Sequence, residues 1–175
     1  MFTRLKQKID DMKTISELCQ GAEKHANLSG NKKPGVEHFM LSALDLPDGA
    51  ARGVFKRLDI EPDGVSQAIK LQHIDALNKI GIDIKSMDLD LNASEVVQPT
   101  SKLYDTQPSG QVLLQDLHQL NKNRSAPLSG VHILEVIASM ENGIATRALK
   151  KMGVDLIAFR RAIEDEKKVA LPFNI

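Results

Sequence analysis

Apolar residues recur every three or four positions along most of the chain, with polar and charged residues between them. This spacing gathers apolar side chains on one face of a helix. It is already clear in residues 2–28, which open with Phe2, Leu5, Ile9 and Met12. The pattern therefore predicts one or two amphipathic helices at the start of the chain.

Glycine and proline divide the rest of the pattern into shorter helices, because both residues interrupt helical structure. Helices are expected at about 37–46, 50–58, 62–80, 108–120, 131–140, 144–152 and 156–168. Residues 82–107 have no sustained helical period and are rich in Asp, Ser and Thr, so we interpret them as a connector with at most a short extended piece. Residues 170–175 form an apolar tail that either packs on the helices or stays loose.

The helices before and after the connector match each other when the chain is shifted by 94 residues, and no gap is needed. His38 then falls on His132, and Gly49 falls on Gly143. Apolar residues coincide in the pairs Phe39 and Ile133, Met40 and Leu134, Phe55 and Leu149, Leu58 and Met152, Ile60 and Val154, and Val65 and Phe159. We infer an internal duplication in which each helical unit hides its apolar face against the other.

These observations predict an all-α domain over residues 1–175. Its first repeat covers about 14–81, its connector about 82–107 and its second repeat about 108–168. Aromatic residues make up only 3% of the chain, so a core of Leu, Ile, Val, Met and Ala is expected. A core of this kind suits packed helices.

Charge and cysteine content narrow the class of protein. The 23 basic and 23 acidic residues balance, which argues against a nucleic-acid partner because such proteins usually carry a basic surplus. Cys19 is the single cysteine and has no partner for an internal disulfide, which fits a reducing compartment. The N-terminal residues lack the apolar run of a signal peptide, and no stretch approaches the roughly 20 apolar residues of a membrane span. We therefore expect a cytoplasmic protein with no membrane partner.

Motifs of common active sites are missing from the sequence. Residues 30–37, GNKKPGVE, begin like a phosphate-binding loop, but Val36 and Glu37 occupy the places of the required Lys and Ser or Thr. The five histidines show no metal-ligand spacing, so neither a metal nor a cofactor is expected. A hydrolase whose residues are brought together by the fold, including a thiol dyad at Cys19, stays open as an alternative.

His38 and His132 occupy equivalent places in the two repeats, whereas a catalytic site normally needs one asymmetric arrangement. We interpret both as structural residues that pack or cap at the start of a helix. Gly49 and Gly143 are interpreted as structural turn residues. Glu37 is different, because its equivalent is Val131. Glu37 is therefore the candidate partner-binding residue.

These residues carry a resemblance to a known family. The segments AEKHANLSGNKKPGVEHFMLSALDLPDGAARGVFKRLDI and GVHILEVIASMENGIATRALKKMGVD resemble the two repeats of the Clp N-terminal domain, which caps the ATP-dependent unfoldases of the Clp family. The first repeat matches at Ala22, Ala26, Gly35, Glu37, His38, Leu41, Gly49, Leu58 and Ile60. The second matches at His132, Leu134, Gly143, Ala145, Leu149, Gly153, Val154 and Asp155. The resemblance covers about residues 14–165.

The resemblance implies a pseudo-twofold bundle of two four-helix repeats without catalytic activity. In that family the domain binds adaptor proteins or substrate segments and passes them to an ATPase ring. The chain is thus expected to be an adaptor, substrate receptor or regulator of a Clp-type chaperone or protease, either as a stand-alone relative or as the N-terminal part of a larger chain. The binding surface is expected in an apolar groove between the repeats or near the start of the His helices.

The sequence departs from one branch of that family, which recognises phosphorylated arginine. In that branch a Glu before each His helps to hold the guanidinium. Glu37 matches, but Val131 replaces the second Glu and Val36 stands where Thr is usual. Phospho-arginine binding is therefore not carried over to this chain. A sensor or ligand-binding domain remains the alternative to a protein-binding module, ahead of a hydrolase.

Overall fold

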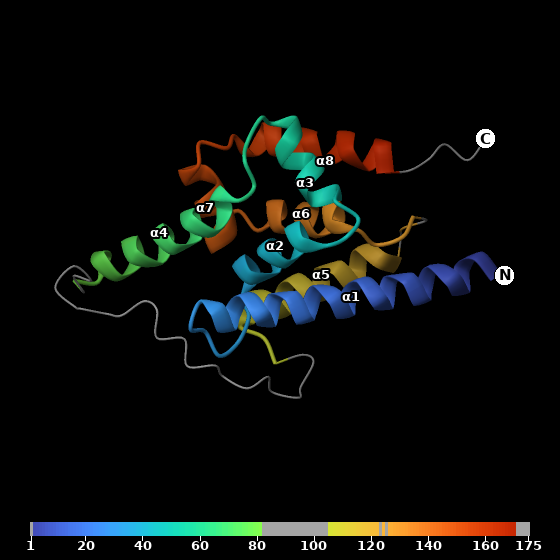
Figure 1. Ribbon diagram of the computed structural model, residues 1–175, viewed down its shortest axis with the longest axis horizontal. Helices are drawn as coiled ribbons and strands as arrows, with labels where there is room; N and C mark the ends of the chain where they lie inside the picture. Colours follow the sequence, from blue (N-terminus) through green and yellow to red (C-terminus); the bar gives the residue numbers. More distant parts are fainter. Residues whose placement is uncertain (1, 82–104, 123, 125, 171–175) are drawn as a thin grey trace.

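The computed structural model describes residues 2–81, 105–122, 124 and 126–170, and these ranges hold eight helices and no strand (Figure 1). The helices are α1 (Phe2–Leu28), α2 (Val36–Asp45), α3 (Ala50–Arg57), α4 (Gly64–Lys79), α5 (Pro108–Lys122), α6 (Gly130–Ser139), α7 (Ile144–Lys151) and α8 (Leu156–Ala170). The all-α prediction is confirmed, and residues 2–28 form one helix. Most of the predicted connector and the end of the tail lie outside the described residues.

Helices α2 and α6 form the centre of the fold (Figure 1). Each has ten residues, of which eight are buried. Helix α2 contacts every described helix except α8, and α6 contacts all but α1 and α4. These two helices are buried on nearly every side, as expected of a helix enclosed by others.

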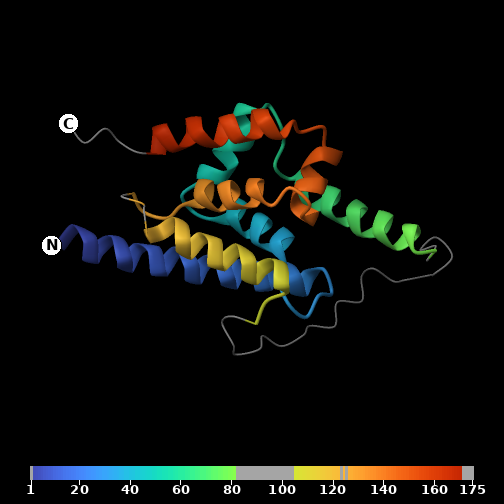
Figure 2. The same cartoon turned by 180° about the vertical axis from the view of Figure 1, so that it is seen from behind.

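The outer helices of one half pack on those of the other half. Helix α8 lies along α3, and α4 lies along α7. Figures 1 and 2 show α3 and α8 together above the central pair, with α4 and α7 at one end of the molecule. Helix α1 packs chiefly on α2 and forms the lower edge in both views. None of the described helices is long and apolar enough to cross a membrane.

Phenylalanine contributes more to the core than the sequence composition suggested. Phe39, Phe55 and Phe159 are among the largest fully buried side chains, beside the expected aliphatic residues. Phe55 of α3 and Phe159 of α8 meet edge to face, with ring centroids 5.7 Å apart and an interplanar angle of 72°. This pair therefore joins the two halves through an arrangement that aromatic rings prefer. The expectation of a purely aliphatic core was wrong because few aromatic residues suffice when they occupy the junction.

The ends of α3 and α7 have the same backbone geometry. Ile60 donates its N–H to the carbonyl of Phe55 at 3.1 Å, and its counterpart Val154 donates to Leu149 at 3.0 Å. The residue before each, Asp59 and Gly153, has a left-handed φ of 56° and 81°. This is the turn that commonly closes a helix. The 94-residue match thus extends from side chains to backbone hydrogen bonds.

Gly49 and Gly143 precede α3 and α7, but they differ in conformation. Gly49 has φ 65°, in the left-handed region that favours glycine. Gly143 has φ −69° and ψ 158°, which any residue can adopt. At Gly143 space is restrictive instead, because a Cβ would lie 3.2 Å from the carbonyl oxygen of Met140.

Asp48 connects the start of α3 to the start of α6. Its Oδ1 accepts a hydrogen bond from the Ala50 backbone N–H at 2.8 Å, and its Oδ2 accepts one from the Gly130 N–H at 3.0 Å. The backbones approach closely here, since a Cβ on Gly130 would lie 2.9 Å from the Cβ of Ala51. One carboxylate therefore satisfies free N–H groups of two helices from different halves.

Replacing Asp48 by Ala should lower the free energy of unfolding by about 2 kcal/mol, since two backbone N–H groups lose their acceptor. Asp48→Asn keeps one amide oxygen as an acceptor and should cost about half as much. Denaturant unfolding followed by circular dichroism measures both. Equal stability of Asp48→Ala and the unaltered protein would show that the carboxylate does not hold the two helices.

Candidate functional site

The two predicted structural histidines occupy the third helical position of α2 and α6. His38 Nδ1 accepts a hydrogen bond from the backbone N–H of Gly35 at 2.9 Å. His132 Nδ1 accepts one from the backbone N–H of Ser129 at 3.2 Å, and it lies 2.9 Å from Ser129 Oγ. Each imidazole thus binds the residue that begins its helix, as a capping side chain does.

Both histidines are neutral at physiological pH. Their side chains are buried, with 1% and 8% of their surface exposed. Burial lowers the pKa of His38 to about 4 and that of His132 to about 4, because the charged imidazolium is poorly solvated there. The positive charge of Arg124 adds to the effect at His132. Neither imidazole is tuned for proton transfer near pH 7.

Glu37, the predicted partner-binding residue, lies inside the protein with 1% of its surface exposed. Its Oε1 is 3.5 Å from Nδ1 of His38, but that nitrogen already accepts a hydrogen bond and has no proton to donate. The nearest ring nitrogen of His73 is 3.9 Å away, and Oε2 has no hydrogen-bond partner. Burial therefore raises the pKa of the Glu37 carboxyl above its ordinary value. Because it is buried, the Glu37 carboxylate is not accessible to a partner.

The charged residues near the start of α6 differ from those near the start of α2. Val131 replaces Glu37, and Lys167 stands 94 residues after His73. Lys167 pairs with Glu135, one turn further along α6, at 2.6 Å between Nζ and Oε1. The pKa of Lys167 is raised by its hydrogen bonds to Glu135 and Glu164, which outweigh the opposing effect of burial. In the second half the acidic residue near the helix start is therefore Glu135, and it is paired with Lys167 of α8.

Cys19 lies on the buried face of α1. Burial, with a smaller contribution from Glu23, raises the pKa of its thiol to about 11. A thiol of this kind stays protonated and unreactive at neutral pH. Among the described residues no group of three or more His, Cys, Asp or Glu side chains is arranged to hold a metal ion.

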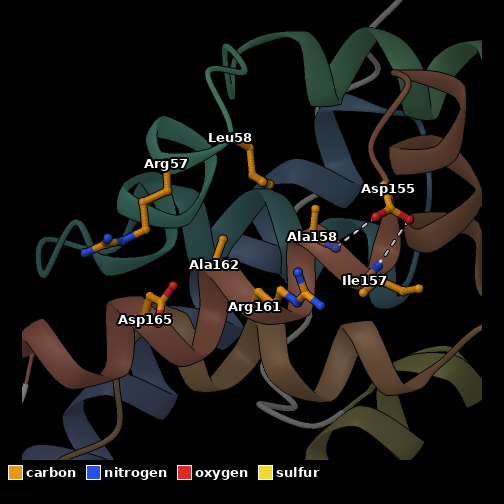
Figure 3. A pocket seen from close by; sticks show the side chains of 8 residues that line it. All are labelled: Arg57, Leu58, Asp155, Ile157, Ala158, Arg161, Ala162 and Asp165. Atoms are coloured by element: carbon orange, nitrogen blue, oxygen red, sulfur yellow. Dashed lines mark hydrogen bonds between the residues drawn. The ribbon is translucent and has the colours of Figure 1, made fainter.

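A surface depression of about 500 Å³ lies between the end of α3 and the start of α8 (Figure 3). Leu58, Ala158 and Ala162 form its apolar floor, and Ile157 stands beside it with 62% of its surface exposed. The charged residues around it are Arg57, Asp155, Arg161 and Asp165. We call this depression the α3–α8 groove.

The charges of the α3–α8 groove are divided between its ends. Arg57 and Asp165 lie at one end, and Asp155 lies at the other (Figure 3). Arg57 is held by Glu166, with 2.6 Å between Nε and Oε2. A hydrogen bond from Lys168 lowers the pKa of the Asp165 carboxyl, and Arg57 adds a smaller attraction. Asp155 accepts hydrogen bonds from the first N–H groups of α8 and so fixes the helix start.

The equivalent space between α7 and α4 is occupied. Met152 is the counterpart of Leu58, and Gly64 is the counterpart of Ala158. The terminal methyl of Met152 lies 3.3 Å from the position that a Cβ on Gly64 would take. Lys151 also forms an ion pair with Asp75 across these helices. Met152 therefore reaches towards Gly64 at the place where Leu58 and Ala158 line the α3–α8 groove.

The sequence indicated a groove between the repeats but did not identify its residues. A signal was present in Leu156, Ile157, Ala158 and Phe159, a run of four apolar residues at the start of a helix. Such a run is wider than one helix face, so part of it must point away from the core. Phe159 is buried, and Ile157 is the residue left exposed.

No protein-family model matches this chain, and a search of the curated proteins found no match.

The pKa values of the histidines predict a loss of stability in acid. Each imidazole binds its proton more weakly in the folded protein, so the unfolded chain is protonated first as the pH falls below 6.5. The free energy of unfolding should decrease between pH 6.5 and about 4, by on the order of 3 kcal/mol for each histidine. His132→Gln should flatten this pH dependence, as measured by urea unfolding at several pH values. A His132→Gln curve parallel to that of the unaltered protein would contradict the assignment.

Replacing Glu37 by Gln should stabilise the protein at pH 7 by about 1–2 kcal/mol, because a buried carboxylate with an unpaired oxygen becomes a neutral amide. The gain should shrink as the pH falls through the raised pKa of Glu37, where the carboxyl takes up its own proton. The exposed Glu61→Gln substitution is the matched control and should change stability by less than about 0.5 kcal/mol. Destabilisation by Glu37→Gln at pH 7 would mean that the carboxylate is paired.

Proposed function

We propose that the chain is a non-enzymatic protein-binding module with the pseudo-twofold arrangement of the Clp N-terminal domain. The matched bounds of α2 with α6 and of α3 with α7 support a repeated unit. The exchanged packing of α8 on α3 and of α4 on α7 is what a twofold relation between the halves requires. The shared His caps and helix-end turns add to this support.

The α3–α8 groove is the proposed binding surface, and it is the observation that carries this proposal. An apolar side chain of a peptide would cover Leu58, Ala158 and Ala162, while Ile157 would be buried beside it. Charged residues of the peptide would meet Arg57 and Asp165 at one end and Asp155 at the other. The ligand class is therefore an unfolded or extended protein segment with an apolar anchor between charged residues.

In the cell, this module would act in the cytoplasm as an adaptor, substrate receptor or regulator of a Clp-type ATP-dependent chaperone or protease. Glu37 is assigned no direct contact with the partner in this proposal, because the side chain is buried. The role of the geometry shared by the starts of α2 and α6 is to hold the two halves together, and the groove supplies the contact with the partner. An assembled Clp ring, a small adaptor of that family and an unfolded model substrate are the partners to be tested.

Ile157→Glu should weaken binding of a fluorescent unfolded substrate, or of the Clp ring, by about tenfold or more, because a charge replaces an apolar contact. Val112→Glu is the matched control, since Val112 is also exposed but lies on α5, away from the groove. Fluorescence anisotropy and co-sedimentation with the ring measure the two interactions. Binding unaffected by Ile157→Glu would remove the groove from the proposal, and failure to bind any of the three partners would overturn it.

A further inference from the structure

The first half of α1 is turned with its polar face inward and its apolar face outward. Leu5, Ile9 and Met12 are 59%, 59% and 71% exposed, although they are the apolar residues that the helical period places on one face. Exposed apolar side chains that gather on one face commonly mark an interaction site. We call Leu5, Ile9 and Met12 the α1 stripe.

Hydrogen bonds on the opposite face fix this rotation. Gln7 donates from Nε2 to the Ala126 carbonyl at 3.0 Å. Asp11 accepts from the Leu128 N–H at 2.6 Å and from Arg124 Nη2 at 3.0 Å. Asp11 is buried, so rotating α1 to hide the α1 stripe would leave a buried charge pair broken. Hydrogen bonds from this face to residues 124–128 therefore fix the orientation of α1 that leaves the α1 stripe exposed to solvent.

The α1 stripe has the spacing of a coiled-coil seam. Its residues are separated by four and then three positions, and Phe2 continues this spacing in the sequence. This alternation is that of the apolar positions in a heptad, and it makes a narrower apolar face than a helix needs to lie in a membrane surface. The next positions of this spacing are Ser16, which is polar, and Cys19, which is buried in the core, so the exposed seam ends after Met12. A single helix of a partner protein fits this surface.

The charged residues beside the α1 stripe indicate which kind of partner helix it would bind. Exposed lysines border the stripe, Lys8 on one side and Lys6 and Lys13 on the other. Among the described residues Lys6 and Lys8 form no ion pair, and Lys13 has only a loose one at 3.8 Å from Glu17. Two copies of α1 packed together would bring lysines against lysines in either direction, which opposes self-association. A partner with Glu or Asp beside its own seam would be attracted instead.

We propose that the α1 stripe binds an amphipathic helix of another protein whose apolar seam is bordered by acidic residues. This site is separate from the α3–α8 groove and does not depend on the function proposed for it. Its two components are an apolar contact through Leu5, Ile9 and Met12 and charge complementarity through Lys6, Lys8 and Lys13.

The test uses the full chain and two synthetic helices of about three heptads with Leu at the seam positions, one with Glu and one with Lys at the bordering positions. Fluorescence anisotropy should show binding of the Glu helix and none of the Lys helix. Ile9→Glu should weaken binding by about tenfold or more. Leu28→Glu, an equally exposed apolar residue near the other end of α1, should not change it. Replacing Lys6, Lys8 and Lys13 together by Glu should reverse the preference towards the Lys helix.

Four results would overturn the proposal. Equal binding of the two helices, or binding that is unaffected by Ile9→Glu, would remove the charge or the stripe from the interaction. Binding of the chain to phosphatidylserine vesicles that Ile9→Glu abolishes, with none to the Glu helix, would assign the stripe to a membrane surface. A dimer in sedimentation that Ile9→Glu converts to a monomer would assign it to a second copy of the chain.

Discussion

Burying the start of a helix is the constraint on which this structure depends. The first N–H groups of a helix have no partner within it, and α2 and α6 both begin inside the protein. Two neutral imidazoles and the carboxylate of Asp48 supply acceptors for N–H groups at these positions. Once the starts are satisfied, the two short helices can be enclosed on nearly every side. The outer helices then have a fixed surface to pack on, and the groove between α3 and α8 follows from that packing.

Sequence periodicity located the helices well, because helix boundaries here are set by local signals. Pro47, Gly49 and Gly153 lie at or beside helix ends, and each acts through its own backbone. The rotation of α1 could not be predicted in this way. It is decided by Asp11 and Arg124, which are 113 residues apart, so a polar contact outweighs the burial of three apolar side chains. Long-range polar pairing leaves no periodic trace in a sequence.

At the candidate site too, some features could be inferred from the sequence, whereas others depend on how distant segments pack. The repeated His residues were interpreted as structural because equivalence under a shift is visible in the sequence. The emphasis on Glu37 came from its lack of a counterpart, but the same comparison says nothing about burial. The groove residues were missed because Leu58 and Ala158 become neighbours only when α8 packs on α3. The comparison of the two repeats in sequence therefore identifies differences in residue type, but not which of them lie at the surface.

The packing of α8 on α3 and of α4 on α7 has a consequence for how the chain folds. A single four-helix unit would leave the apolar face of its last helix without the surface that the other half provides. Two separate units could bury these faces only by associating, and their folding would then depend on protein concentration. Joining them in one chain replaces that dependence by a high effective concentration set by the connecting segment. Because both halves belong to one chain, α8 packs on α3 and α4 packs on α7 at any protein concentration.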